Sequence, residues 1–147
     1  MKPILLIALV FVIGMASGCN RAYTGIYFVD RAENASSVNF EGLDSNLAET
    51  LRPLGFEMRP MPPGTHDYFV LVNDKKRAES MYANMPGADT RISVAVGYRD
   101  LTITIRDQEH DKETVFVKAV KGQIEKMFKD RYGVSELKFR RQADMFL

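Results

Sequence analysis

The chain of 147 residues is 46% hydrophobic and 27% charged, which fits one ordinary globular domain and excludes a collagen-like, disordered or low-complexity chain. Its 20 Lys and Arg residues balance 19 Asp and Glu residues, and this net charge of +1 argues against nucleic acid as the partner. A single cysteine, Cys19, excludes a disulfide within the chain.

The first twenty residues have the layout of a secretory signal peptide. Lys2 supplies a positive start, residues 4–15 are almost wholly apolar, and small residues follow. The apolar run is shorter than the roughly 20 residues that a helix needs to cross a bilayer, so a spanning segment is the poorer interpretation. Removal of residues 1–18 would take away only Lys2, leaving 19 basic residues against 19 acidic ones.

The sequence Ala16-Ser17-Gly18-Cys19 resembles the lipobox of bacterial lipoproteins, although that family prefers Leu where this chain has Ala16. The resemblance implies that Ala16, Ser17 and Gly18 are recognised by the signal peptidase, which cuts before Cys19. It also implies that the Cys19 thiol carries diacylglycerol and that the new amine takes a fatty acid such as palmitate. Two or three acyl chains hold a protein on a membrane far more firmly than one.

The residue after the lipidation site predicts a location. In Gram-negative lipoproteins an Asp there retains the protein at the inner membrane, and this chain has Asn20. The resemblance therefore implies the periplasmic face of the outer membrane, or the plasma membrane surface in a Gram-positive cell. We accordingly expect a signal peptide over 1–18, a lipidated N-terminus and tether over 19–25, and one periplasmic domain over 26–147.

The first elements expected in that domain are a strand over 25–30, a polar loop over 31–42 and a short helix over 43–56. Asp44 or Ser45 could cap the start of the helix. Three leucines at helical spacing give the helix one apolar stripe: Leu47, Leu51 and Leu54. The helix should end near Pro53, because proline lacks the backbone N–H that continues a helix.

Two further strands are expected over 56–61 and 67–74, the second apolar on both faces and therefore central in its sheet. Residues 74–91 form a long polar connection, and such connections are usually functional or disordered. It contains three large side chains suited to contacting a partner, or equally to folding back over a sheet edge: Met81, Tyr82 and Met85.

Alternating residues over 91–108 predict an antiparallel hairpin with one buried face and a turn at 97–100. The spacing of apolar residues predicts a long helix over 112–133, with Gly133 after its end. Residues 134–147 fit either a last strand or a tail. The expected fold is α+β, a mainly antiparallel sheet of about four to five strands with two helices packed on one face.

The stretch from Leu47 to Val72 is similar in pattern to small lipoproteins that assist outer-membrane assembly or transport, the lipopolysaccharide-assembly lipoproteins among them. This resemblance bears on the fold more than on any activity.

No residue pattern predicts catalysis, and we expect no cofactor and no metal. His66 and His110 lack ligand-spaced partners and lie in polar loops beside Asp residues. The acidic residues around 107–113 do not match a calcium loop, because Gly and Glu are missing at the required positions. Cys19 would be consumed as a thioether, so it is not a candidate nucleophile.

Two short basic clusters, at 75–77 and 138–141, predict a solvated face or a surface that attracts anionic headgroups or an acidic partner. The leading hypothesis is a lipid-anchored envelope protein that acts by binding, as an accessory subunit, scaffold or adaptor for an envelope protein partner. One alternative is a small-ligand binder with a pocket between sheet and helices, capped by residues 74–91. Another is an envelope hydrolase.

Overall fold

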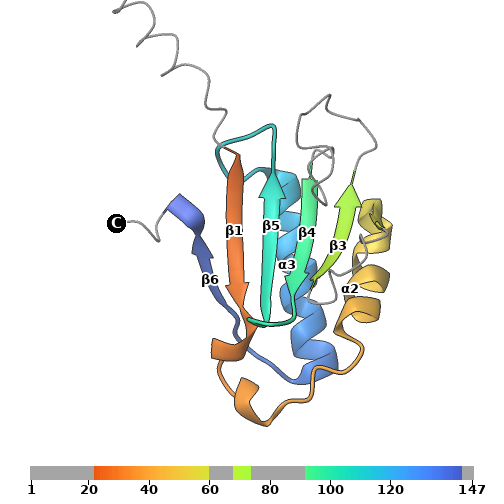
Figure 1. The fold of residues 1–147 in the computed structure, drawn as a ribbon, viewed down its shortest axis with the longest axis vertical. Coiled ribbons are helices and arrows are strands. Elements are labelled where there is room, and N and C mark those ends of the chain that lie inside the picture. Colours follow the sequence, from red (N-terminus) through yellow and green to blue (C-terminus); the bar gives the residue numbers. More distant parts are fainter. Residues whose placement is uncertain (1–21, 60–67, 74–91, 144–147) are drawn as a thin grey trace, which may run out of the picture.

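The computed structural model describes residues 22–59, 68–73 and 92–143, and over these ranges the fold is α+β, as predicted. One open antiparallel sheet contains six strands in the order β2-β3-β4-β5-β1-β6, one more than the expected four to five (Figure 1). The strands are β1 (Tyr23–Phe28), β2 (Phe56–Met58), β3 (Tyr68–Asn73), β4 (Ile92–Gly97), β5 (Thr102–Asp107) and β6 (Lys138–Arg141). The helices are α2 (Leu43–Leu51) and α3 (Val115–Tyr132).

Both helices cover the same face of the sheet, which confirms the expected layering (Figure 1). The strand register places alternate residues of each strand on this inner face, where they meet the apolar sides of α2 and α3. The fully buried side chains of this core include Tyr27, Leu47, Leu71, Ile103, Ile105, Ile124 and Phe128. Burial of this apolar surface supplies the main favourable free energy of folding.

The outer face of the sheet is packed less evenly. β5 alternates between buried and partly exposed residues, as a strand with one buried face should. In β4, however, Ser93 and Ala95 on the outer face are also buried, at 7% and 8% exposure. The prediction of one buried face for the whole hairpin is therefore wrong for β4, and β3 and β4 both lie inside the sheet with a strand on each side.

The helix predicted over 43–56 is shorter, and its cap differs from the prediction. Regular α-helix ends at Leu51, and Pro53 lies in a 3₁₀ turn that follows. Neither Asp44 nor Ser45 caps the start, because Gly42 occupies that position with φ of 70° and makes no side-chain hydrogen bond. A positive φ suits glycine, which has no Cβ.

The second helix also begins later than the predicted residue 112. Thr114 caps α3, its hydroxyl accepting a 3.2 Å hydrogen bond from the backbone N–H of Val117. Gly133 ends α3 in the left-handed conformation, as expected. The segment after it resolves as a strand, because β6 pairs with β1 at the edge of the sheet.

The first strand begins at Tyr23, two residues before the prediction, and ends at Phe28. Residues 23–25, expected in the tether, therefore belong to the sheet. Val29–Arg31 form a 3₁₀ turn, so the prediction that the strand continues to residue 30 is wrong, and Ala35–Ser37 form a second 3₁₀ turn within the expected loop. Phe40 ties this loop to α3 through ring contacts with Phe128 and Tyr132, at centroid distances of 5.9 and 5.4 Å.

Candidate functional site

A hollow of about 450 Å³ opens at the end of the sheet where β1 finishes and the β4–β5 hairpin turns. It is lined by Phe28, Asp30, Arg31, Arg99, Asp100, Leu101 and Thr102. Phe28 and Thr102 pair across β1 and β5, with their side chains on the outer face of the sheet. The hollow therefore does not lie between the sheet and the helices, where the alternative ligand pocket was predicted.

The hairpin turn that forms one wall has an unusual backbone. Leu101 adopts φ of 45°, a left-handed conformation that costs a residue with a Cβ about 1–2 kcal/mol. Its carbonyl accepts a 2.9 Å hydrogen bond from the backbone N–H of Val29, just beyond β1. This bond joins the turn to the 3₁₀ segment after β1, so Arg99 and Arg31 are carried to the same hollow on neighbouring segments.

The two arginines keep their hydrogen-bonding capacity. The guanidinium carbon of Arg31 lies 5.2 Å from the centroid of the Phe28 ring, a cation–π contact that positions this side chain at the hollow. Within the described ranges, neither Arg31 nor Arg99 has an ion pair or a side-chain hydrogen bond, although Asp30 and Asp100 line the same hollow. Both guanidinium groups are exposed and can take an external anion.

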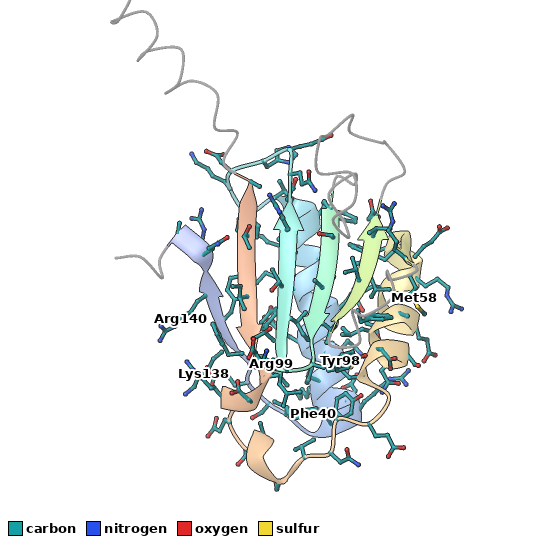
Figure 2. The ribbon with its side chains drawn as sticks, viewed as in Figure 1. Phe40, Met58, Tyr98, Arg99, Lys138 and Arg140 are labelled. Carbon is teal, nitrogen blue, oxygen red and sulfur yellow. The ribbon has the colours of Figure 1, made fainter. Side chains whose placement is uncertain are left out.

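Two more cations continue this surface onto the edge of the sheet. Lys138 and Arg140 of β6 are exposed, and the register places them beside Phe28 and Ile26 of β1, on the outer face. Figure 2 shows Arg99 at the hairpin turn and Lys138 and Arg140 along β6. We call Arg31, Arg99, Lys138 and Arg140 the basic surface. Within the hollow the two arginines are balanced by the carboxylates of Asp30 and Asp100, so the excess of positive charge on this surface comes from Lys138 and Arg140 of β6.

Tyr98 lies beside Arg99 at the same turn and is 36% exposed. Partial burial raises the pKa of Tyr98 to about 12, and the hydrogen-bonded carboxylate of Asp44 adds to the effect. The phenol is therefore neutral at physiological pH and links the turn to the start of α2.

On the inner face of β1, a cluster of polar side chains connects the sheet to α3. The Tyr23 hydroxyl and the Lys121 ammonium both donate to Glu113 Oε1, at 3.2 and 2.7 Å, and the Tyr27 hydroxyl donates to Glu125. Burial, followed by the neighbouring carboxylates, raises the pKa of Tyr23 and that of Tyr27. Each side chain of this set is paired with another member of it, and the pairs tie β1 to α3 and to the residues just before it.

His110 pairs with Asp107 and not with the adjacent Asp111. Its Nδ1 lies 3.0 Å from Oδ2 of Asp107, whose side chain is fully buried, whereas the adjacent Asp111 is exposed. The same Asp107 accepts a hydrogen bond from the backbone N–H of Glu109. These contacts close the loop after β5, and no group of three or more potential metal ligands occurs within residues 22–59, 68–73 and 92–143.

The residues predicted as sites from the sequence lie outside the described ranges. These are Ala16, Ser17, Gly18, Cys19, Met81, Tyr82 and Met85. His66, for which no site was predicted, also lies outside those ranges. The structure therefore does not test lipidation at Cys19 or partner binding by residues 74–91.

The sequence predicts two of the four residues of the basic surface, Lys138 and Arg140, but not the other two. The basic cluster at 138–141 is visible in the sequence, whereas Arg31 and Arg99 are single residues in a predicted loop and a predicted turn. The pairing of Phe28 with Thr102 and the hydrogen bond between Val29 and Leu101 bring those two segments together.

Comparisons with protein-family models, with curated proteins and with solved structures found no match. Among the helices of the described part of the chain, none has the length and apolar character needed to cross a membrane.

Proposed function

We propose that this protein is a lipid-anchored bacterial envelope protein that acts by binding, as an accessory subunit, scaffold or adaptor at the membrane. The proposal combines the lipobox resemblance of residues 16–19 with a folded domain that displays an uncommitted charged surface. In this proposal Cys19 carries the lipid and the domain binds an envelope protein.

The observation that carries the proposal is the position of β1. The strand begins at Tyr23, four residues after Cys19, and every described helix and strand follows it. Cleavage before Cys19 would thus remove none of the described elements. Four residues span at most about 14 Å, so a lipid on Cys19 would hold the start of β1 close to the bilayer surface.

Mass spectrometry of the N-terminal peptide from membrane-extracted protein tests the proposal. We expect the chain to begin at Cys19 with diacylglycerol on the sulfur, and we expect Cys19→Ala to lose acyl labelling and membrane fractionation. Crosslinking of the wild type in cells should then capture an envelope protein neighbour. An unmodified thiol, or a first residue other than Cys19, would contradict the proposal.

A further inference from the structure

We propose that the basic surface binds an acidic, extended segment of a partner protein, which lies along the free edge of β6 and places carboxylates against Arg31 and Arg99. This inference rests on the proposed function and names the partner's chemistry. The evidence consists of the charge of the surface, the open edge beside it and the direction of β1.

Charge is the first argument. The four cations of the basic surface come from three separate segments. Arg31 and Arg99 line the hollow at the end of the sheet, and Lys138 and Arg140 lie on the outer face of β6, opposite Phe28 and Ile26 of β1. Asp30 and Asp100 balance the two arginines inside the hollow, so the local excess of positive charge lies on Lys138 and Arg140 beside it. Arginine holds carboxylates through two parallel hydrogen bonds, and among the described residues neither guanidinium group at the hollow has a hydrogen-bond or ion-pair partner.

The edge of β6 is the second argument. β6 ends the sheet, and within the described ranges no strand pairs with its outer side. An extended peptide can add to such an edge through backbone hydrogen bonds, with side chains giving specificity. Lys138 and Arg140 oppose the addition of a second β6 from another copy, because like charges would meet, and they favour a strand rich in Asp or Glu.

The direction of β1 favours a protein partner over the membrane as the ligand of the basic surface. Tyr23 lies at the end nearest Cys19, and Phe28 lies at the hollow. Six residues of strand rise roughly 17 Å between those ends. With a lipid on Cys19 and β1 upright on the bilayer, the hollow lies at the end of the sheet away from the membrane, where a partner protein can reach it.

The test measures binding of fluorescent poly-L-glutamate to the purified full-length protein in non-ionic detergent, by fluorescence anisotropy at low salt. Two double variants remove the basic surface: Arg31→Gln with Arg99→Gln, and Lys138→Gln with Arg140→Gln. Lys112→Gln with Lys129→Gln is the matched control, because it removes two exposed positive charges elsewhere. Sedimentation with phosphatidylglycerol vesicles, using the same proteins, tests the membrane as occupant.

We expect each basic-surface variant to weaken poly-L-glutamate binding by about ten-fold or more, and the control by less than about two-fold, since local rather than net charge decides binding. Failure of the wild type to bind, or equal weakening in the control, would overturn the inference. Loss of vesicle binding, with peptide binding kept, would assign the surface to anionic headgroups instead. The mass of the Cys19 peptide from the same preparation tests the proposed function separately.

Discussion

Gly25 lies on the inner face of β1, directly under the ring of Phe139 from β6. A Cβ at this position would lie 2.6 Å from Cε2 of that ring, so the ring would have to move. Phe139 also packs on Tyr27, at a centroid distance of 4.8 Å, and beneath the ammonium of Lys121, at 3.7 Å. Because Gly25 has no side chain, the Phe139 ring fits over β1 and β6 can pair with that strand.

We expect Gly25→Ala to destabilise the domain by about 1–3 kcal/mol, because overpacking forces neighbouring side chains out of place. Urea denaturation followed by circular dichroism gives the free energy of unfolding. Gly122→Ala is the control, since nothing lies within 4 Å of a Cβ there, and alanine should stabilise the helix by about 0.5–1 kcal/mol. Equal effects of the two changes would contradict the packing argument.

The Glu113 carboxylate gives a pH-dependent prediction. Burial opposes its ionisation, but hydrogen bonding and charge from Lys121, with the Tyr23 hydroxyl, outweigh burial and hold the pKa of Glu113 below its usual value. A depressed folded-state pKa means that ionised Glu113 stabilises the fold above the unfolded pKa of about 4.3. That contribution is lost as the pH falls through the folded pKa.

Lys121→Met should therefore cost about 1–2 kcal/mol at pH 7, where it leaves a partly buried carboxylate without its cation, and distinctly less at pH 3. Urea midpoints at both pH values measure the difference. Lys126→Met is the matched control, because Lys126 pairs with Asp130 in an exposed position and should have little effect at either pH. A cost that is the same at pH 3 and pH 7 would show that Lys121 contributes through its contact with the Phe139 ring and through packing, and not through Glu113.

Among the elements, the two helices begin in different ways. The Thr114 hydroxyl caps α3, whereas Gly42 begins α2 with backbone geometry alone. We expect Thr114→Ala to cost about 1 kcal/mol, since a backbone N–H in the first turn loses its acceptor. Ser45→Ala, which changes an exposed residue of α2, should stay within about 0.5 kcal/mol. Thermal or urea unfolding of both variants measures the change in the free energy of unfolding. A large loss of stability in Ser45→Ala would support the prediction that Ser45 caps α2.

The elements themselves could be predicted because periodicity is local. The alternation in β5 and the helical spacing of Val117, Val120 and Ile124 fix strand and helix without tertiary information. The cap of α2 was missed because Asp44 and Ser45 have the preferred chemistry, while the cap depends on a left-handed Gly42. Burial on both faces of β4 was missed because small residues such as Ser93 and Ala95 read as a polar face.

For the molecule as a whole, the candidate site was only partly predictable. Lys138 and Arg140 are close in sequence, so their cluster is visible in the chain itself. Arg31 and Arg99 meet because β1 and β5 are antiparallel neighbours, which places the end of one strand beside the start of the other. That pairing joins residues far apart in sequence, and no local pattern encodes it.

The orientation of the domain on a membrane is the last prediction. The backbone N–H of Tyr23 donates a 2.6 Å hydrogen bond to the carbonyl of His110, so exposed Asp111 lies at the Cys19 end of the sheet, whereas exposed Asp100 lies at the hollow. If the Cys19 thiol carries lipid, a cysteine introduced at position 111 or at position 100 is the one free thiol of that variant, and it can be labelled with a fluorophore. Nitroxide lipids in reconstituted vesicles should quench the Asp111→Cys label more strongly than the Asp100→Cys label, because the sheet separates them by roughly 17 Å. Equal quenching, or stronger quenching at position 100, would place the basic surface against the bilayer.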